Sequence, residues 1–306
     1  MNTTWSLLRF CRARKFNTTK IELMMRKFFD WRDEKDLDRI ASIPESHFEK
    51  LKSYHEMGRY GVDVYGRPVY IERVGKSDTT SIMKEIDEQM IEDYFIQLYE
   101  RTVFIELPMA SYAANRRIDG TFSILDLKGL NVSKLFDKRF KAFLKFITTI
   151  SQDYYPELLG KMFIVNAPLL FAGAWSLIKI MIDKKTKNKI ELYSGVPLKK
   201  LEKYVDRRQL PDFLGGSCEI ELRDNHGPWK EPVIESKRLR ILFLKDRSPE
   251  YAYYYTEEER EAVQKKREED SVKKSLNQTE YIIEHESSQA IEIKSFTISF
   301  SQQKRF

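Results

Sequence analysis

The feature that most restricts the fold of this chain is a run without charged residues over 162–178. Its length, seventeen residues, lies at the lower limit for a helix that spans a membrane. Asn166 and Pro168 interrupt the run, and proline inside a helix removes a backbone hydrogen bond. The alternative is a buried strand over 162–165, then a turn and an apolar helix. The interruption favours this second interpretation.

Segments typical of strands alternate with helical segments along most of the chain. β-branched and aromatic residues predict strands over 68–74, 121–127, 161–165 and 189–193. Apolar residues at three-to-four spacing predict helices over 5–57, 82–105, 135–150, 169–182 and 198–205. Pro108 marks a helix end, and Gly58, Gly61 and Gly66 loosen the chain between the first helical part and the first strand. This alternation predicts an α/β fold, with a mainly parallel sheet covered by helices.

The composition excludes several classes of protein. A chain of 306 residues with 42% hydrophobic and 33% charged residues is typical of a globular protein with a buried core. A formal net charge of +6 is too small to indicate a nucleic-acid-binding protein, but it suits contact with an anionic membrane surface. Cys11 and Cys218 provide no disulfide framework, and no long apolar stretch precedes Arg9, so we expect a cytoplasmic location.

The sequence contains no complete motif that is typical of an active site. Val-Gly-Lys-Ser at 74–77 follows a predicted strand, but Tyr70 stands where a phosphate loop needs glycine. The sequence contains no G-x-G-x-x-G and no G-x-S-x-G, and its four histidines form no zinc motif. We therefore predict that the protein is not an enzyme, has no metal site and needs no cofactor other than a bound ligand.

Several polar motifs stand beside the apolar segments in a fixed order. They are Leu-Leu-Arg-Phe-Cys-Arg-Ala-Arg-Lys-Phe at 7–16, Gly-Arg-Pro-Val-Tyr at 66–70, Ile-Leu-Asp-Leu-Lys-Gly at 124–129, Ser-Gln-Asp-Tyr-Tyr-Pro-Glu at 151–157, Gly-Lys-Met-Phe-Ile-Val-Asn-Ala-Pro at 160–168, Leu-Pro at 210–211, Gly-Gly at 215–216 and Gly-Pro-Trp at 227–229. This order resembles the CRAL-TRIO lipid-binding family. Within the family, the chain is most similar to the yeast-type phosphatidylinositol/phosphatidylcholine transfer branch, rather than to the retinal- or tocopherol-binding branch.

The resemblance implies a fold and a domain division. A helical N-terminal part, over 1–57 and shorter than is usual in the family, precedes a lipid-binding domain over 58–233. In that domain a sheet floors a hydrophobic pocket that holds one phospholipid and is closed by a mobile gate helix. A charged extension over 234–306 follows. Its segment 257–274 is typical of an exposed helix or a disordered arm, and 290–300 alternates like a strand.

Two headgroup sites are implied by the resemblance. The inositol phosphate of phosphatidylinositol is expected to meet Arg14, Glu157, Thr186 and Lys189, with added positive charge from Lys15. These residue types suit the ligand, because cations and a hydroxyl bind a phosphodiester, and a carboxylate accepts hydrogen bonds from inositol hydroxyls.

The phosphatidylcholine headgroup is expected at Thr121 and Ser123, which share one face of a predicted strand, together with Tyr70. A second tyrosine of the family falls near Arg59 or Tyr60, and the sequence leaves the alignment of that loop open.

The gate helix is expected over 172–182. Its apolar residues, among them Trp175, Leu177, Ile178 and Met181, surround it almost completely. A helix that is apolar all round is either buried or in contact with lipid.

The resulting hypothesis is a monomeric cytoplasmic protein that exchanges phosphatidylinositol and phosphatidylcholine between membranes. It contacts membranes peripherally, with Golgi and endosomal membranes suggested by resemblance, and presentation of phosphatidylinositol to a lipid kinase is a further role of the same kind. Two alternatives stay open: a carrier of another hydrophobic ligand, such as a sterol or tocopherol, and a lipid-regulated adaptor that uses its charged extension to bind a partner.

Overall fold

The computed structural model describes residues 4–219, 221–224 and 226–229. The predicted charged extension over 234–306, with its segments 257–274 and 290–300, lies outside the described residues.

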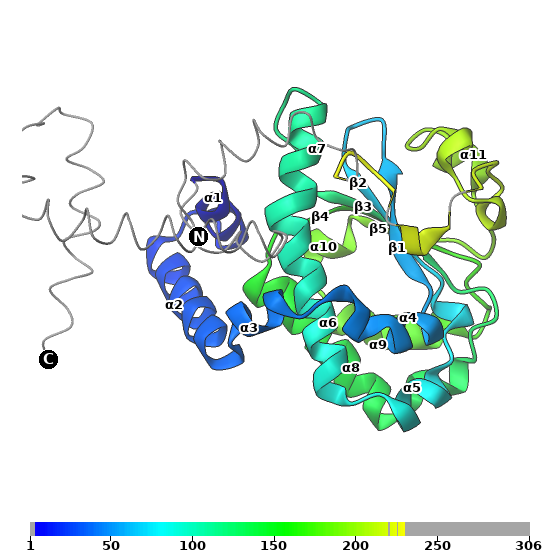
Figure 1. Cartoon of the computed structure of the whole chain (residues 1–306), viewed down its shortest axis with the longest axis horizontal. Coiled ribbons are helices and arrows are strands. Elements are labelled where there is room, and N and C mark those ends of the chain that lie inside the picture. Colours follow the sequence, from blue (N-terminus) through cyan, green and yellow to red (C-terminus); the bar gives the residue numbers. More distant parts are fainter. Residues whose placement is uncertain (1–3, 220, 225, 230–306) are drawn as a thin grey trace, which may run out of the picture. The chain divides into compact units, whose positions relative to one another are not determined.

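The centre of the fold is a sheet of five strands in the order β1-β2-β3-β4-β5 (Figure 1). The strands are β1 (Met57–Val62), β2 (Pro68–Glu72), β3 (Thr121–Asp126), β4 (Leu159–Val165) and β5 (Ile190–Leu192). β1 pairs with β2 antiparallel, and the other neighbours pair in parallel. The predicted α/β class with a mainly parallel sheet is therefore confirmed.

Strand β1 occupies a segment where glycines suggested only a loosened chain. Gly58 pairs with Ile71 of β2, while Gly61 has a φ of 72° beside an irregularity in the β1–β2 register. Glycine adopts that left-handed conformation without strain, so it permits the bulge at the end of the strand. Pairing with β2, rather than the intrinsic preference of these residues, explains why the segment is a strand.

Helices surround the sheet. The α-helices are α1 (Thr4–Ala13), α2 (Thr18–Lys35), α3 (Leu37–Ser42), α4 (Glu49–Tyr54), α5 (Thr79–Glu85), α6 (Glu88–Arg101), α7 (Leu107–Ala113), α8 (Lys138–Thr149), α9 (Phe171–Met181), α10 (Lys184–Lys187) and α11 (Leu198–Leu201). Two π-helical segments, η3 (Thr102–Glu106) and η5 (Ile150–Tyr154), continue α6 and α8. Short 3₁₀ turns are η1 (Glu45–Phe48), η2 (Val74–Lys76), η4 (Val132–Phe136), η6 (Arg207–Gln209), η7 (Asp212–Leu214) and η8 (Leu222–Asp224).

The expectation that Pro108 ends the helix was wrong. The helical run passes from α6 through η3 into α7, and Pro108 lies in the first turn of α7. At this junction the Leu107 N–H bonds to the carbonyl of Thr102, five residues back. The wider π turn starts a new helical segment, and the first turn is where the missing N–H of proline costs least.

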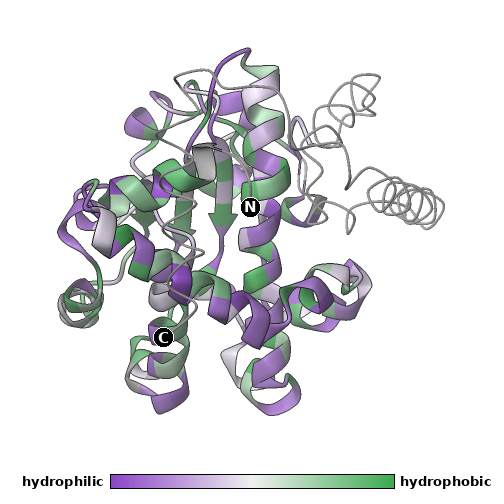
Figure 2. Ribbon diagram, turned by 90° about the vertical axis from the view of Figure 1, so that its left-hand side faces the viewer, coloured by the Kyte–Doolittle hydropathy of each residue, from purple (hydrophilic) through white to green (hydrophobic). Residues whose placement is uncertain are grey.

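The two faces of the sheet pack against different parts of the chain. Phe122 and Ile124 of β3 belong to a buried cluster with residues that follow β5, such as Leu201 of α11. The opposite face carries Tyr70 and Met162, which pack among side chains of α6, α8 and α9. Figure 1 shows α11 on one side of the sheet and α8 and α9 on the other, and Figure 2 shows the hydrophobic strands in the interior. Successive residues of β3 thus face opposite sides of the sheet, as expected for the predicted strand over 121–127.

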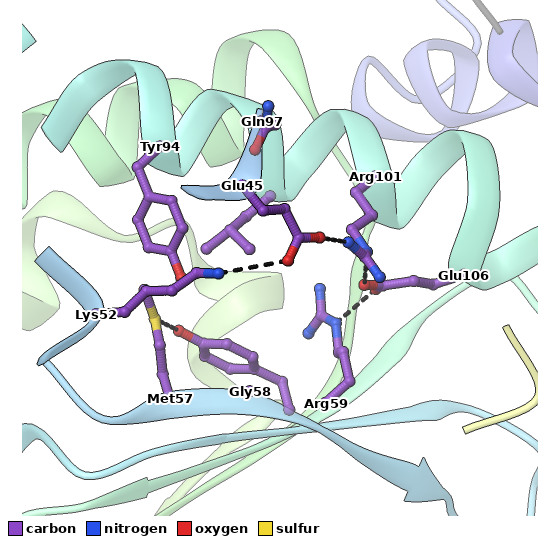
Figure 3. A pocket seen from close by; sticks show the side chains of 11 residues that line it. Glu45, Lys52, Met57, Gly58, Arg59, Tyr94, Gln97, Arg101 and Glu106 are labelled. Carbon is purple, nitrogen blue, oxygen red and sulfur yellow. Dashed lines mark hydrogen bonds and ion pairs between the residues drawn. The ribbon is translucent and has the colours of Figure 1, made fainter. Parts of the chain in front are cut away.

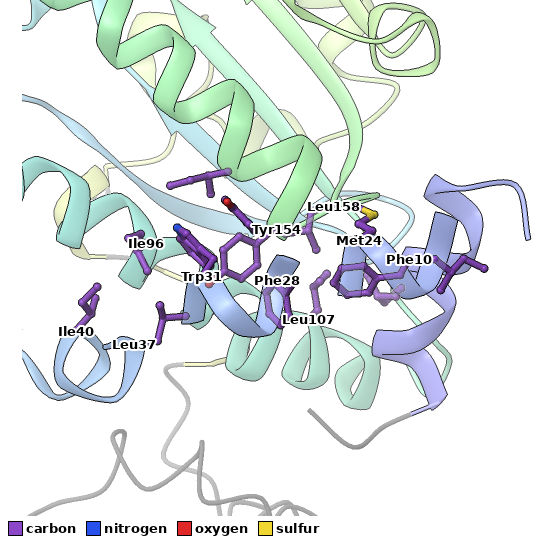
Figure 4. Close-up of a cluster of buried hydrophobic side chains, with 14 of the residues drawn as sticks. Phe10, Met24, Phe28, Trp31, Leu37, Ile40, Ile96, Leu107, Tyr154 and Leu158 are labelled. Carbon is purple, nitrogen blue, oxygen red and sulfur yellow. The ribbon is translucent and has the colours of Figure 1, made fainter. Parts of the chain in front are cut away.

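A separate aromatic cluster holds the N-terminal helices (Figure 4). Phe28 of α2 is fully buried, and its ring centroid lies 5.3 Å from that of Phe10 in α1. Trp31 stacks on Tyr154 of η5 at 4.1 Å, and Phe28 meets the edge of Tyr155 at 6.2 Å. These contacts fix α1 and α2 against the segment that leads to Glu157.

The uncharged run at 162–178 divides between β4 and α9. This confirms the strand and helix predicted for it. Among the described residues, no helix combines the length and apolar character needed to cross a membrane.

Candidate functional site

Glu157 is the centre of a cluster of charges at the ends where β4 and β5 begin. Lys185 donates hydrogen bonds to both carboxylate oxygens of Glu157, each at 2.7 Å, and Lys189 Nζ lies 3.8 Å from Oε2. Lys189 also donates to the backbone carbonyl of Leu159 at 2.6 Å. Burial lowers the pKa of Lys189, and the Glu157 carboxylate opposes that shift. Two lysines therefore converge on one carboxylate at this edge of the sheet.

The backbone of Glu157 has a φ of 63°, in the left-handed region that residues other than glycine seldom adopt. The residue follows Pro156, and its side chain is only 15% exposed. Strained backbone of this kind persists where surrounding contacts hold it, and it concentrates at functional sites. The ion pairs with Lys185 and Lys189 supply such contacts.

Thr186 approaches the same cluster through Asp183. Asp183 caps α10 by accepting hydrogen bonds from the backbone N–H groups of Lys185 and Thr186, and the Thr186 hydroxyl donates to its other oxygen. Burial alone would raise the pKa of Asp183, but these hydrogen bonds lower it overall. The cap fixes a helix of four residues that presents Lys185 to Glu157.

Arg14 lies near an earlier residue of the segment that carries Glu157. Its Nη2 is 3.8 Å from Oδ1 of Asp153, four positions before Glu157, and Lys27 of α2 binds the same carboxylate at 2.8 Å. Lys15 is exposed and has a φ of 50°. The segment 153–157 thus contacts Arg14 through Asp153 and Lys189 through Glu157. Binding of one phosphatidylinositol headgroup by both Arg14 and Glu157 stays a prediction.

Sequence reasoning missed Lys185, Asp183 and Gln152. The Gln152 amide donates to the carbonyl of Met181 at 2.9 Å, and its oxygen accepts from the N–H of Asp183 at 3.1 Å. Gln152 therefore joins the end of α9 to the start of α10. The only local signal for Asp183 was the general preference for aspartate at the N-cap of a helix. No local pattern distinguishes Lys185 from its neighbouring lysines.

The residues predicted for choline lie on the face of the sheet that packs against α6, α8 and α9. Tyr70 of β2 and Ser123 of β3 are register partners, and Arg59 of β1 is the partner of Tyr70 on its other side. Thr121 is buried and its hydroxyl donates to the Leu158 carbonyl at 3.4 Å. Burial and the nearby Glu72 carboxylate raise the pKa of Tyr70, so its hydroxyl remains a neutral donor.

An apolar cavity of about 310 Å³ lies near the opposite ends of the strands. Isoleucine, methionine and phenylalanine side chains of α5, α6 and α8 line it, together with Leu51, Leu130 and Leu135. Its polar groups include His55, whose ring nitrogens lie 3.1 Å from Glu72 and 2.6 Å from Ser77. Cavities of this volume and character are typical of sites for small hydrophobic ligands.

The predicted gate helix is α9. Trp175 is buried and Ile178 half-buried in a cluster with β4 and β5, while Met181 is 36% exposed. The side chain of Leu177 lies outside the described residues. Leu169, which precedes the helix, is 92% exposed, and Ile180 is 79% exposed. One side of α9 thus packs on the sheet, and apolar side chains at both ends meet solvent.

Comparison with known proteins agrees with this architecture. The family model described as CRAL/TRIO domain matches residues 52–216. The chain is 36% identical over 234 residues to the phosphatidylinositol/phosphatidylcholine transfer protein SFH12 of Arabidopsis thaliana, covering 74% of this chain and 43% of that protein. It therefore spans less than half the length of that relative.

A relative of more similar length is the Sec14 cytosolic factor of Schizosaccharomyces pombe. It is 33% identical over 233 residues, which cover 74% of this chain and 80% of that protein. The crystal structure of Sfh5 superposes with a TM-score of 0.55, covering 79% of this chain and 81% of that one. Its sequence identity of 18% shows the fold alone. The family match and the sequence relatives together show that this chain belongs to the CRAL/TRIO family.

Proposed function

We propose that this protein binds phosphatidylinositol and phosphatidylcholine one molecule at a time and exchanges them between membranes. The observation that carries the proposal is the pairing of a charged cluster at Glu157, Lys185 and Lys189 with an apolar cavity on the same sheet. The names of the plant relatives support these two lipids as ligands. Binding and exchange need no catalytic residue.

The geometry suits an amphipathic ligand. The charged cluster lies where β4 begins, whereas the cavity is lined by Glu72 and Leu130, near the ends of β2 and β3. A strand of seven residues such as β4 spans about 20 Å. A phosphatidylinositol molecule would place its inositol phosphate at Arg14, Glu157, Thr186 and Lys189, with Lys15 nearby, and its acyl chains along the sheet. Phosphatidylcholine would place its headgroup at Thr121, Ser123 and Tyr70.

Exchange requires contact with a bilayer. Burying a CH₂ group contributes about 0.8 kcal/mol, so roughly 30 acyl carbons contribute on the order of 24 kcal/mol. A lipid held this strongly does not escape into water at a useful rate. We propose that α9 moves to open the pocket while its exposed apolar ends enter the membrane, and that lysines of α10 attract anionic lipid.

The exposed ends of α9 give a direct prediction. Leu169→Glu combined with Ile180→Glu should slow transfer between vesicles by about tenfold or more, because each apolar side chain contributes roughly 1.5–3 kcal/mol when buried in the membrane. Both side chains face solvent, so the thermal unfolding midpoint should not change. The control is Leu23→Glu on α2, since Leu23 is also exposed, at 70%. Equal slowing in the control variant would contradict a specific role for α9.

Further roles belong to the same proposal. The protein would work from the cytoplasm as a monomer, touch membranes such as those of the Golgi or endosomes transiently, and present phosphatidylinositol to a lipid kinase. A carrier of a sterol or tocopherol is the second candidate. The Glu157 cluster argues against it, because such ligands carry no phosphate for Lys185 and Lys189 to bind. A lipid-regulated adaptor is the third.

The test is mass spectrometry of lipid extracted from the full-length protein, before and after incubation with mixed phospholipid vesicles. We expect phosphatidylinositol and phosphatidylcholine, near one molecule per protein in total. A sterol or tocopherol in their place would favour the carrier. Protein free of lipid in both samples would favour the adaptor.

A further inference from the structure

A row of alternating charges lies between β1 and α6, beside the predicted choline site (Figure 3). Lys52 Nζ is 3.3 Å from Glu45 Oε2, and Arg101 binds the other oxygen of Glu45. Arg101 Nε then lies 3.6 Å from Glu106 Oε1, and Arg59 Nε donates to Glu106 Oε2 at 2.5 Å. Three cations and two anions make up the row, so it carries a net positive charge.

Arg59 is the innermost member of this row. Its side chain is 9% exposed and that of Glu106 is 1% exposed. A second nitrogen of Arg59 donates to the Thr102 hydroxyl. A buried charge is costly unless it is paired and hydrogen-bonded, and these contacts meet that requirement. They also fix the guanidinium in one place.

That place is the face of Tyr70. The guanidinium carbon of Arg59 lies 4.8 Å from the centre of the Tyr70 ring. Aromatic faces are what proteins use to bind quaternary ammonium groups such as choline, through cation–π attraction. Here a cation of the protein itself already occupies the ring face. A choline group brought to this face of Tyr70 would meet a like charge.

The available space leads to the same conclusion. The cavity bounded by Arg59, Tyr70 and Tyr94 has a volume of about 30 Å³. That is room for about two water molecules. A trimethylammonium group, with three methyl groups around its nitrogen, needs more. Arg59 would have to leave its contacts with Glu106 and Thr102 to admit it. Phosphatidylinositol makes no such demand, because the residues proposed for its headgroup lie at the Glu157 cluster.

We propose that Arg59 is a specificity-determining residue that shifts the lipid preference of this protein from phosphatidylcholine toward phosphatidylinositol. The inference rests on the proposed exchange of these two lipids. Arg59 alone would then set the ratio in which the two lipids bind. The rest of the charge row acts by positioning Arg59. Glu106 binds the guanidinium, Arg101 lies beside Glu106, and Glu45 binds Arg101 in turn.

The test is competition between the two lipids. Full-length protein is incubated with vesicles of equimolar phosphatidylinositol and phosphatidylcholine, re-isolated, and analysed for bound lipid by mass spectrometry. The main variant is Arg59→Tyr with Glu106→Gln, because loss of the arginine alone would leave the buried Glu106 carboxylate with only the more distant Arg101 as its cation. We expect the wild type to hold mainly phosphatidylinositol, and the variant to raise the ratio of phosphatidylcholine to phosphatidylinositol roughly fivefold or more.

A second variant keeps the test decisive if the first folds poorly. Arg59→Met with Glu106→Met removes both charges, and replacement of a buried ion pair by apolar residues of similar size is often neutral or stabilising. The same rise in the ratio is expected. Arg208→Tyr is the control, since the Arg208 side chain is 84% exposed, and its ratio should equal that of the wild type.

The outcomes separate the two proposals. An unchanged lipid ratio in a folded, lipid-loaded double variant would overturn the role of Arg59 while leaving lipid exchange intact. A wild type that prefers phosphatidylcholine would do the same. A wild type that takes up neither lipid would overturn the proposed function itself, and the role of Arg59 with it.

Discussion

Replacing Arg14 and Lys189 together by alanine is expected to abolish measurable phosphatidylinositol transfer and to spare phosphatidylcholine transfer. Each side chain would supply a charge-assisted hydrogen bond to the phosphodiester, worth about 1.5–3 kcal/mol. Losing both would weaken binding by roughly 10²- to 10⁴-fold. Phosphatidylcholine should be spared because the residues proposed for its headgroup are Thr121, Ser123 and Tyr70. The measurement is transfer of each labelled lipid between vesicles.

The control for this experiment is Lys203→Ala, which removes an exposed lysine that follows α11 and has no proposed role in lipid or membrane binding. It should leave both transfer activities within about twofold of the wild type, since surface substitutions usually change free energies by less than about 0.5 kcal/mol. Lys189 also binds the Leu159 carbonyl, so its loss could disturb the start of β4. Equal loss of both transfer activities would therefore indicate a misfolded protein or a wrongly assigned site.

The order of strands and helices could be predicted because hydrophobic periodicity is a local property of the sequence. It located β3, β4 and α9 to within about two residues. β1 was not predictable in this way, since its glycines have no intrinsic preference for a strand and the pairing partner β2 supplies the stabilisation. The π-helical junction at η3 could not be predicted either. A proline indicates a helix end in a sequence, and only the structure shows the change of hydrogen-bond pattern that places Pro108 in the first turn of α7.

The contacts within the candidate site are even harder to predict from the sequence than the helices and strands. Resemblance identified Glu157 and Lys189, but the contact between Lys185 and Glu157 depends on the orientation that the Asp183 cap gives to α10. The contact between Arg59 and Glu106 joins residues 47 positions apart and follows no periodic pattern. Motifs predict which residue types a site contains. The neighbours that pair with them, and so set their charge and position, come from the tertiary packing.

The second large effect is expected in the aromatic cluster that supports the site. Phe28→Ala should lower the free energy of unfolding by about 3–5 kcal/mol, because removal of a fully buried phenylalanine loses its burial and leaves a cavity. The ring packs against Phe10, Trp31 and Tyr155. Urea unfolding measures the effect, and the midpoint should fall while the slope stays near its wild-type value.

This variant also tests whether the N-terminal helices hold the headgroup site in place. Tyr155 is followed by Pro156 and Glu157, so a loosened contact with Phe28 should let the strained backbone at Glu157 relax. In protein kept folded at low temperature, phosphatidylinositol binding should then fall more than phosphatidylcholine binding. Leu23→Ala, at an exposed position of the same helix, should change neither the stability nor the lipid ratio. If Phe28→Ala lowers stability but leaves the ratio unchanged, the cluster stabilises the fold without positioning Glu157, and the site depends on Lys185 and Lys189 alone.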